Sequence, residues 1–151
     1  MEWVLLFPLI LMIFQDFKCR QVSLLSMLLF GVLQIGFCFW KYGAIQTGYN
    51  ILANLIVLFV IGTFVTIYAY FCFNQSKQLI GIGDIIFILL LTPYFLFPYL
   101  LHFLIISFIM ALLSWGIEVY LQKKKAFTIP LISYLGICYT IVIIYNSLSC
   151  L

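Results

Sequence analysis

Charged side chains are almost absent from this 151-residue sequence. Only 7% of the residues are Asp, Glu, Lys or Arg, whereas a soluble globular domain has about a quarter. This scarcity excludes a soluble globular domain and a disordered chain, because both need charged or polar side chains to meet water. The seven Lys and Arg residues are spread along the chain and form no patch, which excludes a conventional nucleic-acid-binding protein.

Residues that bind metals or build disulfide frameworks are also few. The chain has a single histidine, and its five cysteines include no Cys-x-x-Cys pair. Most of these cysteines lie inside apolar runs, where a thiol behaves as a small hydrophobic group. We therefore expect no metal site, no cofactor and no disulfide.

Apolar residues make up 67% of the sequence, and they occur in long continuous runs. A helix needs about 20 apolar residues to cross a bilayer core of about 30 Å. Polar breaks divide the chain into six candidate spans, at about 2–15, 22–40, 50–73, 79–93, 98–121 and 127–149. The runs do not alternate as barrel strands do. The sequence therefore predicts an all-α membrane protein, a bundle of about six transmembrane helices that forms one domain over residues 1–151.

Basic residues predict the orientation of the bundle. The N-terminal segment has neither a basic flank nor a small-residue cleavage site, so we expect the first span to be retained. Lys41 alone lies in the second connection, whereas the first, third and fifth connections contain Lys18, Arg20, Lys77, Lys123, Lys124 and Lys125. Because cytoplasmic loops carry the excess of Lys and Arg, both termini are expected outside the cytoplasm.

The two aspartates of the chain both lie at span edges. Asp16 ends the first span and Asp84 begins the fourth. An outward-to-inward helix and an inward-to-outward helix place these two residues at the same, cytoplasmic face. Two carboxyl groups that approach each other share a proton, so one can take a proton from water while the other polarises a peptide carbonyl. The pair therefore predicts aspartic protease chemistry.

The glycines before the second aspartate support this interpretation. Gly81 and Gly83 are expected to allow backbone conformations and a close backbone approach that a side chain would block. Ordinary roles remain open for both aspartates. Asp16 could be an interfacial residue beside Lys18 and Arg20, and Asp84 could be a helix N-cap.

Two segments resemble the aspartate motifs of the type IV prepilin peptidase family, membrane aspartic proteases of the G-x-G-D kind. These are Gly81-Ile82-Gly83-Asp84 and Asp16-Phe17-Lys18-Cys19-Arg20-Gln21-Val22, and Ile129-Pro130 resembles the Pro-containing start of the family's last helix. The resemblance implies a transmembrane peptidase domain, a hydrolase that needs no cofactor. It implies Asp16 and Asp84 as the catalytic pair, and cleavage of the short basic leader of a type IV prepilin or pseudopilin at the cytoplasmic face of the bacterial inner membrane.

The chain differs from the family pattern in three respects. It has no room for the cysteine-bearing insertion of the larger members, so it resembles the short, peptidase-only form. Ile86 stands where the family commonly has a lysine that could tune the Asp84 carboxylate, and Ser23 stands where the first motif has proline. Neither the particular substrate, among those of pilus, secretion or DNA-uptake systems, nor the oligomeric state follows from the sequence.

Two other classes of protein remain as alternatives. A small transporter or a subunit of a membrane complex could use Asp16 and Asp84 to gate protons or to pair with a partner's cations. A transporter usually places its ionisable residue near mid-membrane, however, and both aspartates here lie at one edge. The signal-peptide-peptidase and presenilin type also uses G-x-G-D, but it is larger and has its first aspartate inside a span.

The remaining polar residues have simpler expected roles. Glu118 is expected to reach the interface or to pair with the basic cluster that follows it, and His102 to lie at the outer interface. Asn50, Asn54 and Gln34 are expected to pair across helices. Aromatic residues near span ends, Tyr94 among them, are expected in the interfacial belts.

Overall fold

The computed structural model describes residues 2–19, 21–73, 81–122 and 131–149. A 3₁₀ turn, η1 (Glu2–Leu5), precedes six helices, which are α1 (Leu6–Cys19), α2 (Leu24–Tyr42), α3 (Ala44–Phe73), α4 (Ile82–Leu91), α5 (Tyr99–Gln122) and α6 (Leu131–Ser149). No strand occurs within these described ranges. The predicted all-α bundle is therefore confirmed.

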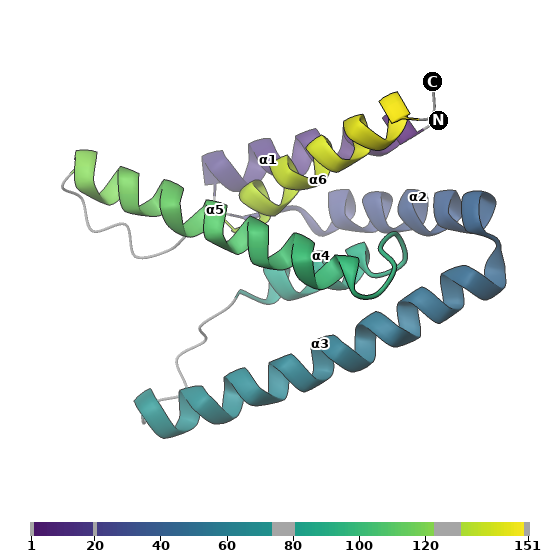
Figure 1. Ribbon diagram of the computed structural model, residues 1–151. Coiled ribbons are helices and arrows are strands. Elements are labelled where there is room, and N and C mark those ends of the chain that lie inside the picture. Colours follow the sequence, from purple (N-terminus) through teal and green to yellow (C-terminus); the bar gives the residue numbers. More distant parts are fainter. Residues whose placement is uncertain (1, 20, 74–80, 123–130, 150–151) are drawn as a thin grey trace.

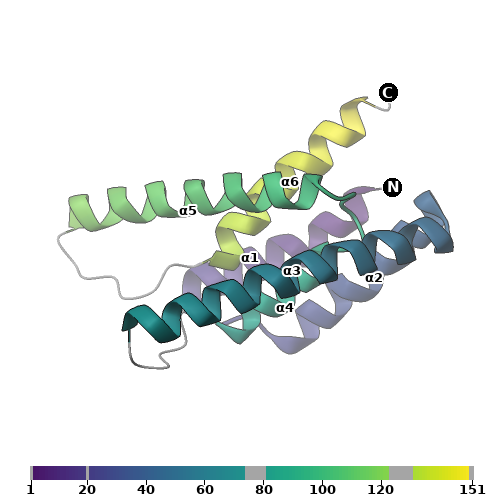
Figure 2. The same ribbon diagram turned by 60° about the horizontal axis from the view of Figure 1, so that its bottom comes forward.

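Two helices, α6 and α2, each pack against three other helices. α6 packs against α1, α4 and α5, and α2 packs against α1, α3 and α4. Figures 1 and 2 show that α3 and α5 extend beyond the C-terminal end of α1 and the N-terminal end of α6, on the same side of the molecule. The C-terminal end of α1 and the N-terminal end of α6 therefore lie further inside the bundle than the C-terminal ends of α3 and α5.

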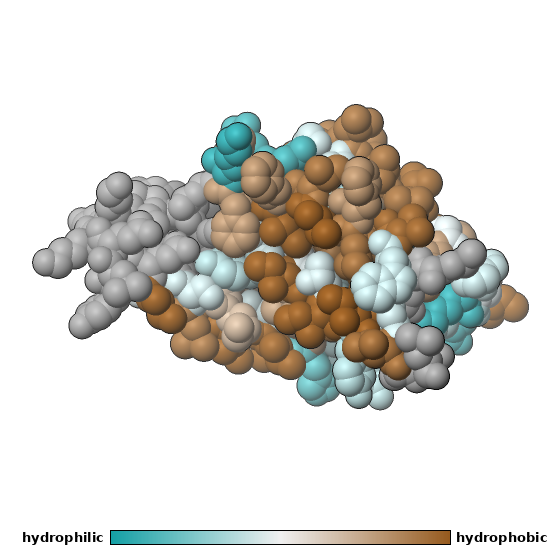
Figure 3. Space-filling model, turned by 90° about the horizontal axis from the view of Figure 1, so that it is seen from above, coloured by the Kyte–Doolittle hydropathy of each residue, from teal (hydrophilic) through white to brown (hydrophobic). Residues whose placement is uncertain are grey.

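The outer surface is apolar. α2, the Ala44–Tyr68 part of α3 and the Leu131–Leu148 part of α6 are each long and apolar enough to cross a membrane, and α4 is a shorter apolar helix. Figure 3 shows apolar side chains over much of the face that it presents. The apolar helices are compatible with a multi-pass membrane protein. α4 is short: its ten residues rise about 15 Å at 1.5 Å per residue.

The connection between α2 and α3 is much shorter than predicted. We expected residues 41–49 to leave the helix, but only Gly43 separates α2 from α3. Gly43 has a φ of 79°, which favours glycine, and its N–H donates to the Phe39 carbonyl at 3.1 Å. The polar residues that suggested a loop belong to α3, where Thr47 is buried with its Oγ1 3.1 Å from the Cys38 carbonyl of α2.

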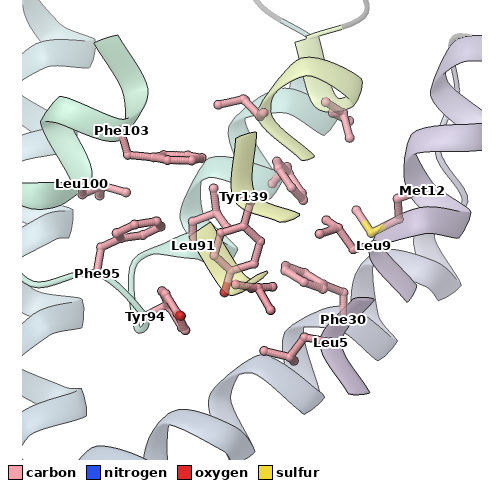
Figure 4. Packing of buried hydrophobic residues seen from close by; sticks show 14 of the residues in the cluster. Leu5, Leu9, Met12, Phe30, Leu91, Tyr94, Phe95, Leu100, Phe103 and Tyr139 are labelled. Atoms are coloured by element: carbon pink, nitrogen blue, oxygen red, sulfur yellow. The ribbon is translucent and has the colours of Figure 1, made fainter. Parts of the chain in front are cut away.

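Aromatic side chains from four helices and one turn fill the centre of the bundle (Figure 4). Tyr139 of α6 lies at the middle, with ring centroids 6.1 Å from Phe30 and 5.2 Å from Tyr94. Its hydroxyl donates to Gln34 Oε1 of α2 at 2.9 Å, so the expected pairing of Gln34 across helices is confirmed. The interfacial position expected for Tyr94 is wrong, since its side chain is 4% exposed and its ring packs in this core.

α3 is attached to the bundle through a polar stripe. Among its described side chains, those that are buried are Thr47, Asn50 and Asn54, spaced so that they share one helix face. Asn54 Nδ2 donates to the carbonyls of Thr92 (2.9 Å) and Phe95 (2.7 Å), which follow α4. The expected pairing across helices is confirmed for Asn54 and wrong for Asn50, whose Oδ1 accepts from Gln46 within α3.

Asn54→Ala is expected to destabilise the bundle by about 1–2 kcal/mol, because two buried carbonyls lose their donor. The measurement is thermal unfolding of the purified protein in detergent. Asn50→Ala is the matched control, since the hydrogen bond of Asn50 to Gln46 stays within one helix. Equal effects of the two substitutions would contradict a role for Asn54 in joining α3 to α4.

Candidate active site

Asp16 continues the buried face of α1. Leu9, Met12 and Asp16 are spaced by three and four residues and are all buried, with Asp16 only 6% exposed. The helix does not end at Asp16, as the sequence suggested, but continues to Cys19. The carboxyl group therefore points toward the interior of the bundle and not toward its outer surface.

Ser133 of α6 binds the Asp16 carboxylate with two donors. The Ser133 backbone N–H donates to Asp16 Oδ2 at 2.8 Å, and the Ser133 hydroxyl lies 2.7 Å from the same oxygen. Sequence reasoning missed Ser133. The sequence contains no clear signal for Ser133, because only the packing of α6 shows that Ser133 shares the buried face of Ile132, Leu135 and Tyr139, where a hydroxyl group needs a partner.

Asp84 lies in the first turn of α4 and is partly buried. Gly81, not Asp84, is the N-cap residue. The Asp84 carboxylate turns back along the helix, where Oδ2 accepts from the Gly81 backbone N–H at 3.3 Å. The backbone N–H of Ile132 in α6 also faces this carboxylate. Asp84 therefore contacts α6 as well as its own helix.

The two aspartates converge on the N-terminal turn of α6. The backbone N–H of Ile132 faces the Asp84 carboxylate, and the next residue, Ser133, donates its N–H to Asp16 at 2.8 Å. The two carboxylates also interact electrostatically with each other. A helix N-terminus presents free N–H groups and favours negative charge, so it can hold two carboxylates that would otherwise repel. Residues 68 positions apart in the chain thus share one site.

Gly81 and Gly83 matter for the room that their missing side chains leave, and not for an unusual backbone conformation. Gly43 is the glycine with positive φ in the described ranges, so Gly81 and Gly83 adopt conformations open to any residue. A Cβ at Gly81 would lie 3.0 Å from Asp84 Oδ2 and would crowd the carboxylate. A Cβ at Gly83 would make ordinary contacts, 3.5 Å from Met27 and 3.6 Å from Ile132. The expected need for a close approach therefore holds at Gly81 only.

Ser23 and Ile86, the two residues that differ from the motifs of the prepilin peptidase family, lie in different environments. Ser23 is the N-cap of α2, and its backbone N–H donates to Gln15 Oε1 at 3.0 Å. A proline has no N–H and could not make this hydrogen bond, so Ser23 and Gln15 tie the end of α1 to the start of α2. Ile86 lies on α4 with 38% of its surface exposed.

Other predicted residues lie away from the two aspartates or outside the described part of the chain. His102 is exposed in the first turn of α5, with Nδ1 3.2 Å from the Pro98 carbonyl. Glu118 is on α5, but its side chain is not among those described. Residues that fall outside the described ranges are Arg20, Lys77, Lys123, Lys124, Lys125 and the Ile129-Pro130 pair.

The site consists of two carboxyl groups in an apolar bundle with no neighbouring metal-binding cluster among the described residues. Asp16 is buried, whereas Asp84 is partly exposed, so one member of the pair is accessible from outside the bundle. No family model, curated protein or solved structure matches the chain. Two interacting carboxyl groups, one accessible, can take up and release protons together, which is the requirement for acid–base hydrolysis.

Proposed function

We propose that this protein is a membrane-embedded aspartic endopeptidase in which Asp16 and Asp84 form the catalytic pair. The observation that carries the proposal is the convergence of both carboxylates on the N-terminal turn of α6, where Asp16 accepts from Ser133 and the two carboxylates interact electrostatically. The proposal requires no cofactor, because a carboxylate and its protonated partner supply both the base and the acid.

Hydrolysis by such a pair proceeds in two balanced steps. The ionised carboxylate takes a proton from water as the water oxygen bonds to the peptide carbon, while the protonated carboxyl gives its proton to the carbonyl oxygen. In the second step, the first aspartate gives its new proton to the amide nitrogen as the C–N bond breaks. The second aspartate recovers a proton from the diol, so both groups return to their starting states.

The proposed substrate class is a prepilin or pseudopilin with a short basic leader followed by an apolar helix. This assignment rests on the resemblance of the two aspartate motifs to the prepilin peptidase family. The apolar surface of the bundle suits a substrate whose helix stays in the bilayer. Lys18 and the basic connections support a site at the cytoplasmic face of a bacterial inner membrane.

The test uses the purified chain in lipid nanodiscs and a model substrate that has a basic leader, one glycine and an apolar 20-residue helix. We expect a single cut at the junction of leader and helix, located by mass spectrometry of both products. The leader alone, without its helix, is the control and should stay uncut. No cleavage of the full substrate would contradict the proposal, and a cut within the apolar helix would favour the signal-peptide-peptidase type.

A further inference from the structure

The two carboxyl groups are bound in unequal ways. Asp16 is buried, and both donors of Ser133 meet its Oδ2 at 2.8 Å or less. Asp84 is partly exposed, and its contact with the Gly81 N–H is long, at 3.3 Å. Hydrogen bonds to an ionised acceptor are shorter than neutral ones, so the Ser133 contacts are of the kind that a carboxylate makes.

The geometry indicates which group donates at Asp16. A backbone N–H can only donate, so Oδ2 of Asp16 acts as an acceptor toward Ser133 N. A proton on Oδ2 would compete with that hydrogen bond. The Ser133 hydroxyl has one alternative acceptor, the Ile13 carbonyl, but that oxygen is 3.4 Å away, against 2.7 Å for Asp16 Oδ2. The hydroxyl proton therefore belongs on the Asp16 contact.

We propose that Ser133 is a positioning residue that keeps Asp16 as the ionised base of the pair and so places the shared proton on Asp84. The inference rests on the proposed peptidase function and gives the two aspartates different roles in it. Asp16 takes the proton from water, and Asp84 gives its proton to the substrate carbonyl. Because both Ser133 donors occupy Oδ2, the other oxygen of Asp16 is the one that meets the water. The partial exposure of Asp84 suits a group that must reach the substrate.

The kinetic test compares Ser133→Ala and Ser133→Thr on the leader–helix substrate. Ser133→Ala removes one charge-assisted hydrogen bond but leaves the backbone donor, so we expect kcat to fall about tenfold to a hundredfold with KM nearly unchanged. Ser133→Thr keeps the hydroxyl and should restore most of kcat. Ser107→Ala is the matched control, because Ser107 is a buried serine whose hydroxyl has no hydrogen-bond partner among the described residues, and the kcat of this variant should not change.

A second arm measures the protonation of the pair without any substrate. A hydrophobic carbodiimide adds to a protonated carboxyl group, whose proton moves to nitrogen as its oxygen bonds to the carbodiimide carbon. The chain has only four Asp and Glu residues, so mass spectrometry assigns each adduct directly. We expect the adduct on Asp84 in the wild type and in Ser133→Thr. In Ser133→Ala we expect the adduct on Asp16 to increase several-fold, and in Ser107→Ala we expect the wild-type pattern.

The kinetic test and the carbodiimide test together distinguish a failure of the peptidase proposal from a failure of the role proposed for Ser133. If the wild type does not cut the substrate but the adduct moves to Asp16 in Ser133→Ala, the peptidase proposal fails while the effect of Ser133 on Asp16 stands. If the wild type cuts and Ser133→Ala changes neither kcat nor the adduct, the role of Ser133 is overturned. Ser133→Cys keeps the side-chain volume with a weak donor, so wild-type activity in this variant would mean that Ser133 only fills space.

Discussion

Asp16→Asn and Asp84→Asn are each expected to lower cleavage of the leader–helix substrate on the order of 10²–10⁴-fold. Asparagine keeps the shape of aspartate, and its carbonyl oxygen can still accept from the N-terminal N–H groups of α6. It can neither take a proton from water nor hold the shared proton. Because the two carboxyl groups act as one unit, the double variant should be no slower than either single variant.

Processing of co-expressed substrate, followed by its mobility shift on a gel, measures this effect beside the membrane level of each variant. Glu118→Gln and His102→Ala are controls that should retain activity. Full processing by either aspartate variant would remove the peptidase interpretation. Loss of the protein from the membrane would instead show that the carboxylates serve mainly to cap α6.

Gly136→Leu is expected to separate α1 from α6 and to abolish activity. A Cβ at Gly136 would lie 2.7 Å from Ile13 Cγ1 and 2.9 Å from Ile13 Cδ1, closer than real Cβ contacts. Small residues allow such close helix packing in membranes, and overpacking costs typically about 1–3 kcal/mol, more when backbone must move. The displacement falls less than one turn from Ser133, so the hydrogen bonds of Ser133 to Asp16 should break as well.

The measurement combines the Tm of the detergent-purified protein with its cleavage rate. Gly36→Leu is the matched control, because a Cβ at Gly36 would meet no atom of the described part of the chain within 4 Å, and this variant should keep both the Tm and the activity. Ile13→Ala in the Gly136→Leu background makes room for the new side chain and should recover part of the Tm. Unchanged Tm in Gly136→Leu would contradict the close packing of α1 on α6.

Runs of apolar residues were sufficient to predict the helices, but not which polar residues end them. Residues 44–49 of α3 were assigned to the connection before the third span because hydropathy cannot distinguish a polar side chain in water from one that faces another helix. Thr47 and Asn54 are of the second kind. In an apolar chain, the direction in which a polar residue points depends on the neighbouring helix, and a single sequence does not contain that information.

The aspartates were predictable for a different reason. A carboxyl group in an apolar segment is costly, so its presence alone calls for an explanation, and the parity of the spans places both groups at one end of the bundle. Ser133 gives no such signal, since a serine costs little in a membrane helix. Its importance depends on the rotation of α6, which brings its hydroxyl to Asp16 Oδ2.

In a bilayer, helices of such unequal length could not all match one hydrocarbon thickness. At 1.5 Å per residue, the 14 residues of α1 rise about 21 Å, which is less than the thickness of a bilayer core of about 30 Å. The 30 residues of α3 rise about 45 Å, which is more than that thickness. Figure 1 shows α3 running obliquely to α2, which shortens its reach across the bilayer. A helix as short as α1 would reach both faces of a bilayer only where the lipid beside it thins.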